Sequence, residues 1–501
     1  MEDRFDRAYR ELIARAKEIA LISSCALLLG WDEETNLPRG GARHRGEQQA
    51  LLAGLEHYRA IDPHLGELLA ECDAALPEGR PIEAANLKEL RRRYERATRL
   101  PRSLVEALAR TATLSQDAWL AAKETRRFSD FAPWLEQVVA LKREEAQALS
   151  AGGELYDALL GHYEPNARWS ELAPLFEALD QALGPLLSAG LAASGQDAIS
   201  LQRNFPFDRQ RAFSVEVAER LGFNLSQGRI DTAAHPSTML IGPGDCRITT
   251  WFRKDDLLDG FYSTLHEVGH GLYDQGLDPE AFGTPAGEAA SLGLHESQSR
   301  LFENLIGRSR GFWTYFYPRA KTVFAPALDD LQLDGFLSAI QRVAPGPIRF
   351  RADEITYNVH ILIRVELERA LLEGRLEARD LPAAWREAYR TRLGIVPADD
   401  AEGCLQDGHW ASAMFGYFPT YTIGNLIAAQ LYQAARRDLG NLDQLFAKGE
   451  FVPLVEWLRD RIHRHGFART PADLVQAATG HPLSHEALVL HLHERYVLHR
   501  A

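Results

Sequence analysis

The sequence predicts one mainly α-helical body with a small β-sheet near the middle of the chain. Three observations support this fold class. Apolar residues recur at helical spacing through most of the first two hundred residues. Two short segments rich in β-branched and aromatic residues, 237–241 and 247–252, flank the turn-forming residues 242–245, which is typical of a β-hairpin. After residue 252 the helical pattern resumes and continues almost to the end of the chain.

Composition limits the classes of protein to which this chain can belong. A chain of 501 residues, 46% of them hydrophobic, can bury a large core, which excludes a small module and wholesale disorder. There are 56 Lys and Arg residues against 70 Asp and Glu residues, a net charge of −14 that argues against a nucleic-acid partner. The four cysteines show no CxxC spacing, so they suggest neither a disulfide framework nor a thiolate metal site. We therefore expect a reducing compartment.

The first part of the chain is expected to be helical throughout. Residues 1–31 predict a charged amphipathic helix rather than a signal peptide, and the apolar stretch 21–31 is too short to span a bilayer. We therefore expect a cytoplasmic protein with no membrane partner. Farther along, Ser129 and Asp130 are predicted to cap a helix that carries Pro133 in its first turn. No fixed-period repeat or linker interrupts the chain, which predicts a single domain over residues 1–501.

The segment HEVGH at residues 266–270 carries the strongest chemical signal. Residues four positions apart share one face of a helix, so His266 and His270 can grip a single metal ion. Glu267, one position along, can hold and deprotonate a water molecule on that metal. Apolar neighbours supply a face for burial, and Gly276 can end the helix. The alternative is a pair of helix histidines that are held by ordinary hydrogen bonds.

A catalytic zinc ion normally has three protein ligands and one position open to water. The third ligand is expected on a second helix, within residues 287–300, where Glu288, His295 and Glu296 are the candidates. A histidine ligand at 295 fits the spacing, and so does a helical carboxylate some two dozen residues after the first motif. The residues alone leave the choice between His295 and Glu296 open.

Together, HEVGH and the segment HESQSR at residues 295–300 resemble the carboxypeptidase Taq family of metallocarboxypeptidases. Further segments of the family pattern follow in order: DCRIT at 245–249, IRFRAD at 348–353 and GCLQDGHW at 403–410. Residues 31–38, WDEETNLP, also resemble the N-terminal region of that family, so the similarity covers nearly the whole chain.

This resemblance implies a set of roles for the residues of the site. His266, His270 and Glu296 are implied as the metal ligands and Glu267 as the general base. The family is mostly helical, with a deep groove leading to the metal, and commonly forms homodimers. On this basis residues 1–200 are expected to form one wall of the groove, and residues 201–501 to carry the metal site with the small sheet beside its helix.

Two positions depart from the family pattern. The family segment HPF is His235-Pro236-Ser237 here, which leaves any packing role of the missing Phe in question. Position 351, expected to be acidic, is Arg351, which adds positive charge and can change side-chain preference.

A carboxypeptidase must recognise a free terminal carboxylate, and the planar fork of arginine suits that group. Arg247 and Arg349 are the candidates by motif position. The alternative for either is a structural salt bridge with a nearby acidic residue, of which Asp245, Asp353 and Glu354 are the candidates.

A developing oxyanion needs hydrogen-bond donors besides the metal. His409 and Tyr421 are the candidates, because related zinc peptidases place a His and a Tyr near the metal from this part of the chain. The alternative is a buried His and a core Tyr. Asp407 is expected to orient a neighbouring group rather than to bind metal.

The sequence thus predicts a metal-dependent carboxypeptidase that releases single amino acids from peptide C-termini. Zn²⁺ is the expected cofactor, with Co²⁺ or Mn²⁺ as alternatives, and the expected partners are peptide substrates and a second copy of the chain. The first alternative function is a helical zinc oligoendopeptidase or dipeptidyl carboxypeptidase that uses the same site. The second is a helical binding scaffold without catalysis.

Overall fold

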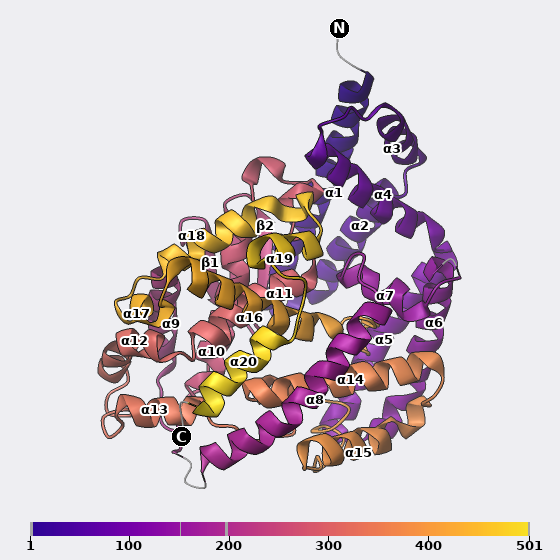
Figure 1. Cartoon of the computed structure of the whole chain (residues 1–501). Coiled ribbons are helices and arrows are strands. Elements are labelled where there is room, and N and C mark those ends of the chain that lie inside the picture. The colour runs from indigo at the N-terminus through magenta and orange to yellow at the C-terminus, as the bar shows by residue number, and fades with distance from the viewer. Residues whose placement is uncertain (1–3, 151, 196–198, 499–501) are drawn as a thin grey trace. The chain divides into compact units, whose positions relative to one another are not determined.

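The computed structural model describes residues 4–150, 152–195 and 199–498, and it confirms a mainly helical fold with a small β-sheet (Figure 1). Two compact units can be distinguished, each discontinuous in sequence. The first consists of Met1–Thr98, Ile199–Ile340 and Ile427–Leu483, and the second of Arg99–Ala198, Gln341–Leu426 and Ser484–Ala501. In Figure 1 the first unit accordingly combines indigo, rose and yellow segments. The predicted single domain, with portions 1–200 and 201–501 and a groove, stays a prediction.

The first unit contains the N-terminal helices, the sheet and the helix that carries HEVGH. Its α-helices are α1 (Arg4–Thr35), α2 (Ala42–Ala60), α3 (Pro63–Ala75), α4 (Pro81–Arg99), α9 (Phe207–Leu221), α10 (Leu258–Asp274), α11 (Leu292–Arg300), α12 (Arg310–Val323), α13 (Leu333–Ile340), α17 (Leu442–Ala447), α18 (Val452–Arg461) and α19 (Pro471–Thr479). Its shorter helical turns are η1 (Arg39–Gly41), η3 (Pro279–Ala281), η4 (Pro285–Gly287), the π-helical η5 (Leu301–Ile306) and η8 (His463–Ala468).

The predicted N-terminal helix is confirmed as α1, which packs its apolar face on α3 and α4. Phe5 and Leu12 of α1 are fully buried against Leu69 of α3 and Leu87 of α4. Phe5, Ala8 and Leu12 recur at the three- and four-residue spacing that places them on one side of α1. Burial of this stripe therefore explains why the charged N-terminal segment folds as a helix.

The predicted hairpin is confirmed, and it belongs to a three-stranded sheet. Strands β2 (Ser237–Gly242) and β3 (Asp245–Thr250) pair antiparallel, so the second strand begins and ends two residues earlier than expected. A third strand, β1 (Gly228–Thr232), pairs parallel with the other edge of β3. Strand β1 was not predicted, because it contains the charged residues Arg229 and Asp231 and its partner β3 is not adjacent in sequence.

Side chains of β2 and β3 alternate between two faces of the sheet. Ile248 and Thr250 lie on the face that packs on α10, where Ile248 lies beside Gly271 and the Thr250 hydroxyl is 3.0 Å from that of Thr264. Arg247, which directly precedes Ile248, lies on the opposite face. The sheet therefore presents one face to the HEVGH helix and the other to α1, which contacts β2.

The second unit is built from long helices. They are α5 (Arg102–Thr125), α6 (Ala132–Ser150), α7 (Leu155–Tyr163), α8 (Trp169–Ser194), α14 (Glu354–Glu373), α15 (Leu381–Leu393) and α20 (Glu486–Tyr496), with short turns η2 (Phe128–Asp130), η6 (Arg349–Arg351) and η7 (Ala378–Asp380). Helix α16 (Pro419–Leu439) begins in this unit and ends in the first.

Helix α6 carries Pro133 in its first turn, as predicted, but it is not capped by Ser129 and Asp130. Those residues lie in η2, where the Asp130 carboxylate accepts hydrogen bonds from Arg127. Local contacts therefore engage both carboxylate oxygens of Asp130: Arg127 donates to Oδ2 and the Ser129 hydroxyl to Oδ1.

Two features bear on the expected environment of the protein. No helix in the described part of the chain is both long and apolar enough to cross a bilayer. All four cysteines lie among the described residues, and each has a free thiol.

Candidate active site

Helix α10 carries the HEVGH segment in the first unit, and contacts at its start and on its buried side hold it in place. Its first turn is capped by Asp256, whose carboxylate accepts hydrogen bonds from the backbone N–H groups of Leu258 and Asp259. On its buried side, Phe261 stacks on Phe213 of α9 at 5.5 Å between ring centroids. The helix confirms the predicted i, i+4 arrangement, which places His266 and His270 on one face, and it ends at Asp274, just before Gly276.

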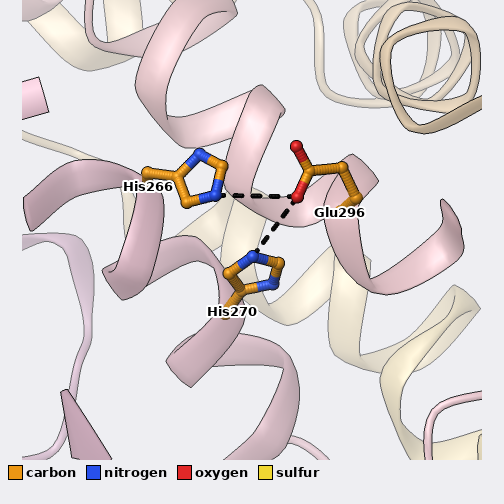
Figure 2. A group of neighbouring side chains, drawn as sticks. All are labelled: His266, His270 and Glu296. Atoms are coloured by element: carbon orange, nitrogen blue, oxygen red, sulfur yellow. Dashed lines mark ion pairs between the residues drawn. The ribbon is translucent and has the colours of Figure 1, made fainter. Parts of the chain in front are cut away.

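The structure brings His266, His270 and Glu296 together. Their candidate ligand atoms lie within 4.8 Å of one another. Figure 2 shows both imidazoles directed at the same carboxylate oxygen: Glu296 Oε2 lies 3.6 Å from His266 Nε2 and 3.4 Å from His270 Nε2. Two imidazoles from α10 and one carboxylate from α11 thus converge on one point.

Gly269 makes this convergence possible. A Cβ atom at position 269 would lie 2.5 Å from the carbonyl oxygen of Gln298 and 2.6 Å from Ser299 Cα. Any side chain there would push α11 away from α10, and Glu296 with it. The glycine inside HEVGH therefore serves the approach of the two helices.

His295, the other candidate for third ligand, has different partners. Its Nε2 lies 2.9 Å from Asp274 Oδ1, and its ring stacks on that of His270 with centroids 4.3 Å apart. His295, held by Asp274, therefore packs against the face of the His270 ring, whereas Glu296 faces both imidazole Nε2 atoms.

Further contacts orient the three side chains. His266 Nδ1 lies 2.9 Å from Glu303 Oε2, and Arg300 Nη1 donates to the same oxygen at 2.8 Å. Because Glu303 engages Nδ1, the His266 ring is held with Nε2 toward Glu296. Ser299 Oγ donates to Glu296 Oε2 at 3.1 Å. Glu303 lies in the π-helical η5, a distortion often found at functional sites.

The donor set fits a divalent metal ion. Glu296 Oε1 is buried and has no hydrogen-bond partner among the described residues, so one ligand oxygen is still unsatisfied. Two imidazoles and a carboxylate with a fourth position for water are a known ligand set of catalytic zinc. The three side chains therefore match a metal site in chemistry as well as in spacing.

Electrostatics within the cluster favour a cation at this point. Burial raises the pKa of Glu296, but the two histidines outweigh it and lower that pKa to about 2. Burial and the neighbouring His295 lower the pKa of His270 to about 4. Burial also lowers the pKa of His266, but the Glu296 and Glu303 carboxylates outweigh this and raise it to about 9. The cluster thus attracts one positive charge, which a metal ion can supply in place of the His266 proton.

Glu267 is buried beside the cluster, and one hydroxyl group holds its side chain. Thr238 Oγ1, on β2, lies 2.7 Å from Glu267 Oε2 and 3.1 Å from the Glu267 backbone oxygen. Burial raises the pKa of Glu267, opposed by the charge of His266 and by the Thr238 hydrogen bond. The carboxylate thus has a fixed orientation and an increased affinity for a proton, as a general base requires.

We expect Thr238→Val to lower kcat about tenfold, because a hydrogen bond to a charged group contributes about 1.5–3 kcal/mol. The substitution keeps the branched shape and removes the hydroxyl that orients Glu267. Thr238→Ser keeps the hydroxyl and should restore most of the activity, and both variants should bind as much metal as the wild type. Equal kcat values for the valine variant and the wild type would contradict this role for Thr238.

Arg247 is engaged on the face of the sheet opposite α10. Its Nε and Nη2 donate to the two Asp245 oxygens at 2.9 and 2.8 Å, and its guanidinium lies 4.1 Å from the centre of the Trp31 ring. The third nitrogen, Nη1, has no hydrogen bond within the described residues. Arg247 thus forms the salt bridge with Asp245 that the sequence offered as the alternative to substrate binding. Its Nη1 is still available to donate a hydrogen bond to another group.

The residues that depart from the family pattern lie at the edge of this sheet and in the second unit. Ser237 Oγ lies 2.7 Å from the Thr249 hydroxyl and 3.4 Å from Glu34 Oε2, so a polar contact occupies the position of the missing Phe. Arg351 is exposed in η6, with its guanidinium 5.3 Å from the centre of the Phe350 ring.

The remaining candidates form a second group, in the second unit. Arg349 donates to Asp407 Oδ1 through Nε at 3.0 Å and Nη2 at 2.8 Å, and to the Tyr357 hydroxyl through Nη1 at 3.0 Å. Arg364 Nε donates to the other Asp407 oxygen at 2.6 Å. Burial raises the pKa of Asp407, but the two arginines outweigh it and hold that pKa well below its usual range. Asp407 is therefore an ionised anchor for Arg349, consistent with its expected orienting role.

His409 and Tyr421 contact each other in this group. His409 Nε2 lies 3.0 Å from the Tyr421 hydroxyl oxygen. Burial lowers the pKa of His409 to about 4, in spite of nearby Asp407. The imidazole is therefore neutral near pH 7 and can donate or accept one hydrogen bond.

Several residues of the two groups were not found by sequence reasoning. Thr238 and Asp274 gave no signal, because their partners lie in other segments. Glu303 could have been found, since it follows Glu296 by seven residues, which is two helical turns. Arg364 could not, because its contact with Asp407 joins positions 43 residues apart.

Comparison with known proteins extends this description to the whole chain. Residues 11–496 match the family described as carboxypeptidase Taq (M32) metallopeptidase. The chain is 45% identical to thermostable carboxypeptidase 1 of Thermus thermophilus, with 98% of each chain covered. It is 33% identical to carboxypeptidase 1 of Bacillus subtilis, with 97% of each covered. Among solved structures, the M32 carboxypeptidase of Deinococcus radiodurans R1 matches with a TM-score of 0.94 at 37% identity, covering 98% of this chain and 99% of that one.

Proposed function

Because the chain belongs to the carboxypeptidase Taq (M32) family and is a metallocarboxypeptidase, we propose that it releases single C-terminal residues from peptides by means of a zinc ion that His266, His270 and Glu296 hold. The observation that carries this proposal is the convergence of two imidazole Nε2 atoms on one carboxylate oxygen. Zn²⁺ suits this donor set with one position left for water, and Co²⁺ or Mn²⁺ are the alternatives, since metal identity also depends on availability.

When bound, the metal supplies polarisation of the scissile carbonyl and a lowered pKa for a water molecule. Glu267 then acts as the general base: it accepts a proton from the attacking water and passes it to the leaving amine. Its burial beside His266 and its hydrogen bond from Thr238 support this role.

His409 and Tyr421 are proposed to donate hydrogen bonds to the oxyanion that develops on the substrate carbonyl. The neutral state of His409 and its contact with the Tyr421 hydroxyl support this, because each side chain carries a hydrogen-bond donor and the two lie together. Asp407 is proposed to act only through Arg349.

Arg247 and Arg349 are proposed to recognise the terminal carboxylate of the substrate. Both guanidinium groups are anchored by an aspartate, which limits their freedom before substrate binds. Charge-assisted hydrogen bonds of this kind contribute about 1.5–3 kcal/mol each, which corresponds to roughly ten- to over a hundredfold in kcat/KM.

Amidation of the substrate's C-terminus removes the charge that these arginines are proposed to read. The wild-type enzyme should therefore lose about ten- to a hundredfold in kcat/KM on the amide relative to the free acid. Arg247→Ala and Arg349→Ala should lose similar efficiency on free acids and discriminate less between acid and amide, whereas a misfolded variant would lose both substrates equally. The products are identified by mass, with and without a chelator: single amino acids support the proposal, and dipeptides or internal fragments contradict it.

We further propose that the protein is a cytoplasmic homodimer. Four free cysteine thiols support a reducing compartment. Exposed apolar side chains on α1 and α2, among them Leu21, Leu51, Leu55 and Tyr58, offer a surface for a second copy. Light scattering from the purified protein measures the assembly state directly.

A further inference from the structure

Helix α14 presents a row of polar side chains from inside the second unit. Tyr357, Arg364 and Glu368 are seven and four residues apart, so they share one face of the helix, and all three are buried. Tyr357 accepts a hydrogen bond from Arg349, and Arg364 donates to Asp407. The first two members of the row thus hold residues of the second candidate group.

Glu368, the third member, is fully buried and accepts hydrogen bonds from three places. The Trp410 indole N–H donates to Oε2 at 2.8 Å. The backbone N–H of Gly416 donates to Oε1 at 2.7 Å, and the Tyr156 hydroxyl of α7 donates to the same oxygen at 2.8 Å. Among the described residues no Lys, Arg or His forms an ion pair with this carboxylate. A buried carboxylate without a cation is costly, so its three hydrogen bonds must offset that cost.

Two of these three donors belong to residues 407–416, which we call the His409 segment. The segment starts at Asp407, held by Arg364, and ends at Gly416, held by Glu368, with His409 between them. Its backbone needs such support. Ala413 has a φ of +57°, which is unfavourable for a residue with a side chain, and a Cβ at Gly416 would lie 2.7 Å from the backbone of Leu159.

We propose that Glu368 is a positioning residue for the reaction, which acts through Trp410 and Gly416 to hold the His409 segment in the conformation that presents the His409 side chain. This rests on the proposed role of His409 as a hydrogen-bond donor to the oxyanion. Glu368 contacts Trp410, Gly416 and Tyr156, so its effect on the reaction is indirect. Its carboxylate fixes the residue next to His409, and Arg364 fixes Asp407 on the other side.

The protonation state of Glu368 should matter for this function. An ionised carboxylate accepts from all three donors at once, whereas protonation gives one oxygen an O–H of its own that must be accommodated among these donors. Burial raises the pKa of Glu368 to about 7, although the three donors and the charge of Lys142 on α6 lower it. Lys142 is itself paired with Glu145 and forms no ion pair with Glu368. Activity that depends on this carboxylate therefore increases as pH rises through about 7.

Stability should respond to the same ionisation with the opposite sign. The pKa of Glu368 in the folded protein lies above its ordinary value of 4.5, so the folded state binds this proton more tightly than the unfolded state. The contribution of Glu368 to stability is thus fully present below pH 4.5 and is lost as pH rises through about 7. If the carboxylate served stability alone, activity and stability would change in the same direction with pH. If it positions the His409 segment, activity increases with pH while its contribution to stability decreases.

The test compares Glu368→Gln with the wild-type holoenzyme on a free-acid peptide. Glutamine is neutral at every pH, and its amide nitrogen cannot accept a hydrogen bond. We expect kcat to decrease about ten- to a hundredfold at pH 8, with KM changed less than about threefold and bound metal unchanged. The increase of kcat between pH 6 and 8 should become smaller in the variant. The Tm difference between variant and wild type should shift in favour of the variant as pH rises.

Two further variants locate the effect. Tyr156→Phe removes a donor to the same carboxylate from α7 and leaves the contacts to the His409 segment in place, so it should retain most of kcat. Trp410→Phe removes the indole N–H and should reproduce the loss, which keeps the proposal testable if Glu368→Gln does not fold. Wild-type kcat in Glu368→Gln, or equal losses in Tyr156→Phe and Trp410→Phe, would overturn the inference. Absence of free amino acids from the wild-type digest would instead contradict the proposed function.

Discussion

Glu267→Gln is expected to lower kcat by about 10²–10⁴-fold, because general base catalysis typically contributes that much. Glutamine keeps the size of the side chain and can still accept the hydrogen bond from Thr238, but it cannot take a proton from water. The adjacent ligands His266 and His270 are unchanged, so bound metal should equal that of the wild type. Steady-state kinetics together with metal analysis of the purified variant measures both quantities.

A matched control is Glu216→Gln, the same chemical change at a partly exposed position of α9, where the carboxylate pairs with Arg319. It should leave kcat unchanged. If Glu267→Gln lost less than tenfold under conditions where the control is fully active, Glu267 could not be the general base.

Removal of the proposed third ligand should have the largest effect on metal binding. In Glu296→Ala the carboxylate oxygen that faces both imidazoles is lost, and only two ligands remain. In His295→Ala only a supporting ring is lost, and such outer contacts typically contribute about 10–100-fold in metal affinity. We therefore expect Glu296→Ala to bind metal more than a hundredfold more weakly than the wild type. His295→Ala should bind metal about 10–100-fold more weakly than the wild type.

Competition with a chelator, followed by metal analysis, ranks the three proteins. The two variants differ at adjacent positions of α11, so general damage to this helix would affect both. Equal metal retention in Glu296→Ala and His295→Ala would show that Glu296 is not the third ligand, and it would return His295 to consideration.

Much of the fold could be predicted because helices leave a periodic pattern of apolar residues. This pattern correctly indicated α1 and α10, and the turn residues between two β-branched segments correctly indicated the hairpin. Strand β1 escaped because its pairing with β3 is not local and its composition is partly charged. The cap predicted at Ser129 and Asp130 was wrong because Arg127 pairs with Asp130.

The candidate site shows the same division between local and distant information. The relation of His266 to Glu267 and His270 follows from spacing on one helix. The hydrogen bond from Thr238 to Glu267 does not, because 29 residues and a change from strand to helix separate the two. The partners of Arg247 and Arg349 were expected to be acidic residues. Asp245 fits that expectation, whereas Asp407 comes from a different segment than the acidic neighbours considered for Arg349.

The sequence by itself determined that His266, His270 and the proposed general base Glu267 lie on one helix, and that positions 266 and 270 lie on the same side of it, since the helix has 3.6 residues per turn. From the residues alone, two adjacent positions, His295 and Glu296, were both candidates for the third metal ligand. Only the tertiary structure decided which one faces the histidines. Contact between α10 and α11 at Gly269 sets the rotation of α11, so that Glu296 points at both imidazoles and His295 points at Asp274. The physical reason is that side-chain direction along one helix follows from local geometry, whereas the rotation of one helix against another depends on packing between segments that the sequence order does not bring together.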